Sequence, residues 1–326
     1  MLKPSSNRKI LKELRPKTIL SNGEIETVEK IESRKDVLSR YRKKQFFGIL
    51  PCKCKLGTYY YLHLDDDNVA ESLLAFGCYG YERATAAIFT QLSKEADLVL
   101  DLGSFTGYYS VLAGRLGKAK NIVSIEANPL NYQRLKDNLK INGLRVHAFN
   151  NALVPSADIT EYIDIKFNSK LRVLDTGGFV DHEANEVAIA KKNKLDTYSI
   201  KTISMQKILA EVPFPKVSSY ILAKIDIEGL EVPISAELID RYPNNLVAIV
   251  EIIFESTYAK LKDFIRLSDS FVLAYINEDK LSIVDVADSS WHEFRVKGSR
   301  NLLICSRRIW DEIEPLNISE FLSLAE

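Results

Sequence analysis

From about residue 98 onward, short apolar runs of strand length alternate with segments whose apolar residues recur at helical spacing. Strands are predicted at 98–102, 122–125, 145–149, 220–225, 246–253, 271–276 and 302–305, and helices at 108–116, 130–142, 203–209 and 232–238. Apolar strands separated by helices are typical of a parallel sheet that is covered on both faces. We therefore predict an α/β fold with a mostly parallel, seven-stranded sheet. The last strands have no helical pattern between them, so we expect an antiparallel edge.

The chain before residue 77 follows a different pattern. The aromatic and β-branched run at 51–64 turns at Gly57 and predicts a β-hairpin, and a short helix is expected at 68–76. Residues 24–47 have apolar positions compatible with broken helices. We therefore divide the chain into an N-terminal helical arm and β-hairpin extension at 1–76 and an α/β domain at 77–326. Period-two alternation at 159–167 predicts an added strand in that domain.

Charge is distributed unevenly along the chain. The 326 residues include 44 basic and 44 acidic side chains, but residues 1–50 hold thirteen basic and six acidic ones. A neutral total and 46% hydrophobic residues exclude a disordered chain and a protein that coats nucleic acid through general basicity. The basic arm is compatible with docking on its own core, on a second subunit of a homo-oligomer, or on an anionic acceptor.

The cysteine count and the hydropathy indicate in which cellular compartment the protein is expected. Four cysteines make no disulfide scaffold, the N-terminus shows no signal-peptide pattern, and no run reaches the roughly 18 apolar residues of a membrane span. We therefore expect a cytoplasmic protein. Cys52, Cys54, His63 and Cys78 are four potential zinc ligands without a second paired spacing, so ordinary thiols are favoured.

The strongest motif follows the first strand of the domain. That strand ends in Asp101, and Gly103 and Gly107 precede a helix, so the backbone can turn sharply and approach a ligand. The next strand ends in Glu126, where a carboxylate can accept the hydroxyls of a ribose. A dinucleotide would need a glycine where Phe105 stands. The pattern instead favours S-adenosylmethionine (SAM), which has no phosphates.

Four segments carry a more specific resemblance. LVLDLGSFTGYYS at 98–110, VSIEANP at 123–129, NNAL at 150–153 and AKIDIEGLE at 223–231 resemble the FkbM family of SAM-dependent methyltransferases. The resemblance implies a Rossmann-like class I methyltransferase fold and SAM as the cofactor. It also implies O-methylation of a hydroxyl on a saccharide, a glycan or a related small molecule.

The resemblance further implies which residues bind SAM. Asp101, Gly103 and Gly107 would shape the methionine end, Glu126 would hold the ribose, and the remaining residues would line the loop or lie beside the adenosine: Ser104, Phe105, Thr106, Tyr108, Tyr109, Ala127, Asn128, Asn151 and Ala152. Members of the family commonly read G-A-N-x-G where this chain has G-S-F-T-G. An asparagine contact is therefore missing, and Phe105 must point elsewhere or pack on the ligand.

Candidate catalytic residues follow the strand at 220–225. Lys224, Asp226 and Glu228 alternate at period two at the carboxyl end of that strand, where open α/β sheets bind ligands. A hydroxyl acceptor benefits from a base or a metal, so Asp226 is the first candidate for the base or for a divalent metal ligand, and Glu228 is the second. Lys224 would orient the acceptor. Glu228 could instead stabilise a helix N-terminus, and Glu251 could face the same site.

Two other classes of function stay open. A nucleic-acid or N-methyltransferase would usually show an N-P-P-Y-like run where this chain has D-I-E-G, and a SAM-binding partner protein would need no catalytic residues. His182 lies in a polar stretch and is a further candidate base, whereas an exposed loop position is the simpler interpretation. We expect a small-molecule or glycan acceptor and no nucleic-acid partner.

Overall fold

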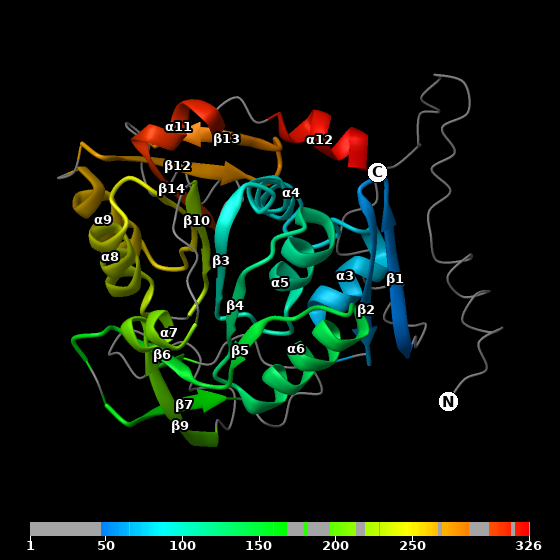
Figure 1. Cartoon of the computed structure of the whole chain (residues 1–326), viewed down its shortest axis with the longest axis horizontal. Helices are drawn as coiled ribbons and strands as arrows, with labels where there is room; N and C mark the ends of the chain where they lie inside the picture. Colours follow the sequence, from blue (N-terminus) through cyan, green and yellow to red (C-terminus); the bar gives the residue numbers. More distant parts are fainter. Residues whose placement is uncertain are drawn as a thin grey trace.

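The computed structural model describes residues 47–64, 66–158, 160–167, 179–180, 196–212, 219–227, 229–266, 269–286, 300–313 and 317–325. In this part of the chain, an eight-stranded sheet runs in the order β13-β12-β14-β11-β10-β3-β4-β5 (Figure 1). Its strands are β3 (Ala96–Leu102), β4 (Ile122–Ile125), β5 (His147–Phe149), β10 (Tyr220–Ile225), β11 (Leu246–Glu251), β12 (Phe271–Asn277), β13 (Ser282–Asp285) and β14 (Asn301–Ser306).

Five neighbouring strands, from β11 to β5, pair in parallel. The predicted α/β, Rossmann-like class I methyltransferase fold is thereby confirmed. One detail of the prediction was wrong, since the sheet has eight strands instead of seven. The expected antiparallel edge is confirmed, because β14, β12 and β13 at one end of the sheet pair antiparallel, with β14 between β11 and β12. Every residue of β14 is buried, which fits an internal strand. Sequence order alone does not reveal that the last apolar run returns into the middle of the sheet.

Helices cover both faces of this sheet. One face packs against α4 (Arg83–Leu92), α5 (Tyr108–Leu112), α6 (Pro129–Ile141), α11 (Arg307–Ile313) and α12 (Ile318–Ala325), and the other against α7 (Met205–Glu211), α8 (Glu231–Arg241) and α9 (Glu255–Arg266). Successive side chains of a strand point to opposite faces. In β3, Val99 accordingly packs in the first cluster, and Leu98 and Leu100 pack in the second.

The helix predicted at 108–116 is interrupted. α5 ends at Leu112 and continues as a π-helical turn, η1 (Ala113–Gly117). Helices α9, α11 and α12 were not expected from the sequence. In α9, Tyr258, Leu261 and Ile265 are buried at helical spacing, so the signal was present in the pattern.

The predicted hairpin is confirmed as β1 (Gly48–Cys54) and β2 (Gly57–His63), which pair antiparallel. It is followed by α3 (Asn68–Phe76), whose N-cap is Asp67: its side chain accepts hydrogen bonds from the backbone N–H groups of Val69 and Ala70. The helical arm expected up to residue 46 lies outside the described residues.

Asn138 of α6 and Asn142, which caps the end of that helix, tie the hairpin to the domain. Asn142 both accepts a hydrogen bond from the Tyr60 N–H and donates one to the Tyr60 carbonyl. Asn138 accepts one from the Leu62 N–H and donates one to the Thr106 carbonyl, both at 2.8 Å. Asn138 therefore connects β2 to the loop between β3 and α5.

A second, smaller sheet lies beside the main one. Its order is β6-β9-β7-β8, from β6 (Ala152–Val154), β7 (Tyr162–Phe167), β8 (Phe179–Val180) and β9 (Asp196–Ser204). The strand predicted at 159–167 thus exists as β7, although it joins this separate sheet. The predicted helix at 203–209 begins later, at Met205, because residues 203 and 204 still belong to β9.

The described helices include none that is long and apolar enough to cross a bilayer.

We expect Asn138→Ala to lower the free energy of unfolding by about 2–4 kcal/mol, because it leaves the Leu62 N–H and the Thr106 carbonyl without their partner. Urea denaturation of the purified protein measures this change. Lys140→Ala, at an exposed position of the same helix, serves as the control. A loss no larger than that of the control would contradict a structural role for Asn138.

Candidate active site

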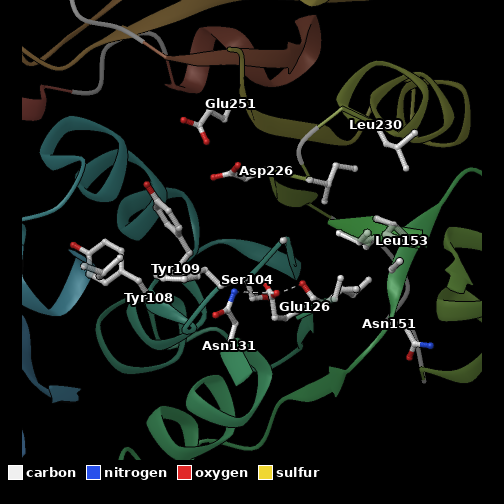
Figure 2. A pocket seen from close by; sticks show the side chains of 18 of the residues that line it. Ser104, Tyr108, Tyr109, Glu126, Asn131, Asn151, Leu153, Asp226, Leu230 and Glu251 are labelled. Atoms are coloured by element: carbon white, nitrogen blue, oxygen red, sulfur yellow. Dashed lines mark hydrogen bonds between the residues drawn. The ribbon is translucent and has the colours of Figure 1, made fainter. Parts of the chain in front are cut away.

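A cavity of about 210 Å³ opens where β3, β4, β10 and β11 end (Figure 2). This edge is where the order of the sheet reverses between β3 and β10, and such switch points bind ligands in open α/β folds. Ten residues proposed from the sequence line the cavity: Gly103, Ser104, Phe105, Tyr108, Tyr109, Glu126, Ala127, Asn151, Ala152 and Asp226. Chain segments 123 residues apart, at Gly103 and Asp226, thus contribute to one site.

The glycine loop lies directly against the end of β10. Gly103 has φ +81°, and a Cβ at this position would lie 1.7 Å from the backbone oxygen of Asp226. Gly107, at φ +87°, precedes α5, and a Cβ there would lie 2.4 Å from Cδ1 of Leu135. Gly103 is therefore required by close packing against backbone as well as by its conformation, whereas Gly107 is favoured chiefly by its positive φ.

Phe105 occupies the left-handed region with φ 50° and lines the cavity. Its backbone N–H donates a hydrogen bond of 2.8 Å to Oε2 of Glu126. The ring thus stands in the wall of the cavity, while its N–H joins the loop to the neighbouring strand end. Non-glycine residues adopt this conformation rarely, and such strain is frequent at ligand sites.

Glu126 is held from three directions. Besides Phe105, the Asn128 N–H donates to Oε1 at 2.8 Å, and the Asn131 side chain donates at 3.3 Å (Figure 2). Burial raises the pKa of this carboxyl from 4.5 to about 7, although the donors act in the opposite direction. A ribose that offers two further hydroxyl donors would favour the ionised carboxylate.

Four of the proposed cofactor residues support the loop and do not line the cavity. Asp101 is buried and accepts hydrogen bonds from the N–H and the hydroxyl of Ser110, and burial raises its pKa to about 6. The Thr106 hydroxyl bonds that of Tyr61, Gly107 precedes α5, and Asn128 caps α6. These four residues hold the framework of the site.

The opposite wall comes from the small sheet. Ile163 and Ile165 of β7 line the cavity beside Ala127 and Ala152. Asn151 donates hydrogen bonds to the carbonyls of Lys201 and Thr202, which lie in β9. Neither isoleucine was expected at the site from the sequence, although their period-two spacing was visible. They give this side the apolar character that an adenine ring needs.

Acidic side chains gather at the other end of the cavity. Asp226 and Glu251 line it and face each other from the ends of β10 and β11 (Figure 2). The buried Lys224 ammonium lies 3.2 Å from Oδ2 of Asp226 and 5.4 Å from the centre of the Tyr109 ring. Arg300, also in the lining, lies 3.8 Å from Glu251. Lys224 itself is beneath the cavity wall, 1% exposed.

These charges determine the protonation of the site. Burial alone would raise the pKa of Asp226, but the charge of Lys224 and a hydrogen bond with Glu251 hold it below its ordinary value. Burial and the charge of Asp226 raise the pKa of Glu251 well above its ordinary value. Burial would lower the pKa of Lys224, yet the carboxylates of Asp226, Glu82 and Glu251 raise it. The Asp226 carboxylate therefore stays ionised to a lower pH than usual, and the Glu251 carboxyl keeps its proton to a higher pH than usual.

Two further residues of the lining were absent from the sequence analysis. The amide oxygen of Asn68, at the start of α3, is buried without a hydrogen-bond partner, so a donor on a ligand would satisfy it. Tyr81 lines the cavity near Tyr109, whose hydroxyl donates to Glu82. Neither position belongs to a recognisable motif, since both reach the site from the segment before β3.

Two of the candidate catalytic residues cannot be located in the structure. Glu228 and His182 lie outside the described residues. Among the residues that the structure does describe, no group of three or more His, Cys, Asp or Glu side chains could hold a metal ion. The four candidate zinc ligands of the sequence analysis therefore form no such group, and the divalent metal at Asp226 stays a hypothesis.

Comparisons with known proteins match parts of this chain. A family model described as the TRM5/TYW2 methyltransferase domain matches residues 78–167, the part with the glycine loop and Glu126. An uncharacterized protein of Methanocaldococcus jannaschii, MJ1452, is 36% identical over 86 residues, which cover 25% of this chain and 30% of that protein. The chain thus spans under a third of the curated relative that it matches.

Solved structures give more distant similarities. An O-methyltransferase of Bacillus cereus, solved with SAH, has a TM-score of 0.37 at 12% identity, covering 68% of this chain and 78% of that chain. A methyltransferase FkbM of Methylobacillus flagellatus has a TM-score of 0.35 at 12% identity, covering 64% and 44%. Over residues 78–167 the chain is therefore similar to a methyltransferase domain. Its placement in the FkbM family stays a prediction.

We expect Glu126→Gln to weaken the binding of S-adenosylhomocysteine (SAH), the demethylated product, about ten- to a hundredfold at pH 8, because charge-assisted hydrogen bonds to the ribose are lost. In the wild type, SAH affinity should rise about tenfold from pH 6 to pH 8, as the Glu126 carboxyl ionises. The Gln variant should lack this rise. Isothermal titration calorimetry measures both effects.

Asp137→Asn on the neighbouring helix α6 is the matched control and should bind as the wild type does. An unchanged affinity in Glu126→Gln would remove Glu126 from the ribose site.

Proposed function

We propose that this methyltransferase transfers the methyl group of SAM to a neutral N–H or O–H group of its acceptor, and that Asp226 accepts the proton. One observation carries the proposal: an ionised carboxylate, paired with a buried lysine, lines the cavity beside the glycine loop. The acceptor would enter at this end, and the nucleoside would lie toward Glu126 and the small sheet.

The residues present fit SAM at this site. Glu126 offers a carboxylate to the ribose, and Ala127, Ala152, Ile163 and Ile165 offer apolar contacts to the adenine. Gly103 and Asp226 pack against each other and both line the cavity, so the methionine part would lie over this junction. SAM supplies an activated methyl group on a sulfonium, so the protein has to position the acceptor and to take up its proton.

The proposed reaction balances within this site. A bond forms between the acceptor heteroatom and the methyl carbon while the carbon–sulfur bond breaks, and the electron pair of that bond stays on the sulfur of SAH. The acceptor proton passes to Asp226. Lys224 keeps that carboxylate ionised and fixes one of its oxygens at 3.2 Å. General base catalysis of this kind typically contributes about 10²–10⁴ to a rate.

The first candidate acceptor is a nucleic acid. The match of residues 78–167 to the TRM5/TYW2 methyltransferase domain supports an RNA acceptor such as tRNA, whose bases carry N–H groups. This similarity favours the alternative over the saccharide that we expected from the FkbM resemblance. The segment after β10 reads D-I-E-G, however, and offers no N-P-P-Y run.

The second candidate is a hydroxyl of a saccharide or a related small molecule. It is favoured by the carboxyl groups at the acceptor end of the cavity, Asp226 and Glu251. Carboxyl groups suit hydroxyl donors and repel phosphate groups that come close to them. A nucleic acid would have to bring a base to this end while its phosphates stay outside.

Asp226→Asn should lower turnover about 10²–10⁴-fold, because the amide cannot accept the proton, while SAH binds with nearly wild-type affinity. Methyl transfer from radiolabelled SAM and calorimetry with SAH measure the two quantities. Asp263→Asn, at an exposed position of α9 that does not line the cavity, is the control. Near-normal turnover in Asp226→Asn would show that another group takes the proton.

The same radiolabel assay distinguishes the acceptors. Total RNA and saccharide fractions are offered separately, each with and without ribonuclease. Label that enters the RNA fraction and is lost after ribonuclease treatment supports the nucleic acid, and ribonuclease-resistant label in the saccharide fraction supports the hydroxyl.

A further inference from the structure

Seven exposed cations gather on a surface away from the cavity. They come from three chain segments, 48–64, 111–125 and 138–150, which contain no aspartate or glutamate. Within the part of the chain that the structure describes, none of the seven forms an ion pair. We call this surface the basic edge, and its cations are Lys53, Lys55, Arg115, Lys118, Lys120, Lys140 and Arg145.

Direct contacts bring the three segments together. The Arg115 guanidinium of η1 donates hydrogen bonds of 3.0 and 3.2 Å to the Thr58 carbonyl of the hairpin. The Asn142 amide, at the end of α6, bonds the backbone of Tyr60 in the same hairpin. The hairpin thus touches both η1 and the end of α6, so the basic edge is one continuous surface.

The basic edge lies at the amino ends of the strands. Lys120 and Arg145 stand just before β4 and β5, two parallel neighbours, whereas the cavity lies where β3 and β4 end. Helix α6 connects the two places. It begins at its cap Asn128, which donates to Glu126 of the cavity, and Lys140 lies in its last turn. Its 13 residues, at 1.5 Å each, separate the two ends by about 20 Å.

The hairpin runs along α6 over this distance (Figure 1). Successive contacts join it to α6 at Asn142, at Asn138 and, just beyond β2, at Arg134, which pairs with Asp66 at 2.9 Å. Asn68 follows two residues later and lines the cavity. A continuous protein surface therefore leads from the basic edge to the cavity.

An exposed aromatic ring accompanies the cations. Tyr60 is 39% exposed and pairs across the hairpin with Pro51, two residues before Lys53. Opposite residues of a hairpin share a face, as do residues two apart in a strand, so Tyr60 and Lys53 are on the same face. A ring for base stacking beside cations for the backbone is typical of surfaces that bind single-stranded nucleic acid.

The acidic neighbours of the basic edge lie outside its three segments, among them Glu95, Asp97 and Asp137. Two of these carboxylates are already engaged: Asp97 accepts a hydrogen bond from the Ser219 N–H at 2.6 Å, and Asp137 accepts one from the Gln133 side chain at 3.2 Å. The chain before the hairpin is itself basic, since residues 1–50 hold thirteen basic and six acidic side chains. The cations of the basic edge are therefore suited to an anionic partner.

The dimensions point to a polymer. A molecule that reacts in the cavity and also touches the basic edge spans about 20 Å, which corresponds to about six stacked nucleotides at roughly 3.4 Å each. At the acceptor end, the Asp226 and Glu251 carboxyl groups repel phosphates that come close to them. A nucleic acid therefore needs a separate place for its backbone, and the basic edge supplies one.

We propose that the basic edge binds the phosphate backbone of an RNA acceptor whose target base enters the cavity, and that Tyr60 stacks on an unpaired base of this RNA. The inference rests on the proposed function with RNA as the acceptor. The RNA follows the hairpin and α6 from the basic edge to the cavity, so that one base reaches the acidic end while its phosphates stay outside.

Removal of two cations tests the basic edge. Lys118→Gln/Lys120→Gln should weaken the binding of fluorescein-labelled bulk tRNA about tenfold at low salt, and lower the slope of log affinity against log salt by about one to two. Fluorescence anisotropy without SAM measures both. Lys260→Gln/Lys280→Gln, exposed in α9 and in the turn after β12, changes the total charge equally and should bind as the wild type does. An unchanged SAH affinity in calorimetry shows that both variants are folded.

Substitution of Tyr60 tests the stacking. Tyr60→Ala should weaken the binding of the same tRNA about fivefold or more and leave the salt slope unchanged, because a stacked base is lost but no phosphate contact. Tyr60→Phe keeps the ring and should bind as the wild type does. Wild-type affinity in Tyr60→Ala would overturn the stacking role.

The remaining outcomes separate this inference from the proposed function. Equal effects of the two double variants overturn docking at the basic edge. So does binding to vesicles of phosphatidylcholine and phosphatidylserine that depends on Lys118 and Lys120 while tRNA binding does not. An active Asp226→Asn overturns the proposed function without touching these binding results. Label in the saccharide fraction alone, with no tRNA binding, overturns the inference and leaves the methyl transfer standing.

Discussion

The backbone of Gly103 lies so close to the carbonyl of Asp226 that no side chain fits between them, since a Cβ would come within 1.7 Å of that oxygen. This contact joins the loop after β3 to the end of β10, two strands that are neighbours in the sheet. The cofactor loop and the candidate base are thus placed by one packing constraint. Any displacement of the loop changes the distance between the donor and the base, and geometry within fractions of an ångström decides methyl transfer.

The packing of Gly103 against Asp226 fixes the geometry of the site, and the buried Lys224 fixes its charge. An ammonium inside an apolar sheet would be unstable without compensation, and the carboxyl groups around it supply that compensation. The arrangement keeps one carboxylate ionised in a partly closed cavity, where its interactions are stronger than in water. Tyr109 adds its ring to the same lysine, and its hydroxyl bonds Glu82 at the start of α4. The charge of the Lys224 ammonium is therefore stabilised by groups at the end of β10, in α5 and at the start of α4.

Much of the fold could be predicted because its strands are apolar throughout. The core strands β3, β4, β10 and β11 were identified within about two residues, and the D-x-G-x-x-x-G motif located the cofactor loop. The position of β14 could not be predicted, because sequence carries no direct record of which strands become neighbours. The small sheet was recognised only through β7, since β6 and β8 are too short to show a period.

Site residues that belong to a sequence motif could be predicted. Site residues that come from distant segments without a motif could not. Gly103, Glu126 and Asp226 line the cavity, as expected from strand ends. Asn68, Tyr81 and Arg300 also line it, but they come from three segments without a shared motif. Asp101 shows the opposite case: the motif identified it, and its side chain holds Ser110 instead of facing the cavity.

The N-terminal hairpin is connected to Thr106 of the cofactor loop by hydrogen bonds, once directly and once through Asn138. Tyr61 of β2 meets the Thr106 hydroxyl, and Asn138, which holds β2, meets the Thr106 carbonyl. Thermodynamic linkage makes such a connection reciprocal: whatever restricts Thr106 restricts the hairpin, and loosening the hairpin relaxes the loop. The hairpin that precedes the α/β domain thus contributes to the free energy of cofactor binding. Without the hairpin, the same domain would bind the cofactor with a different affinity.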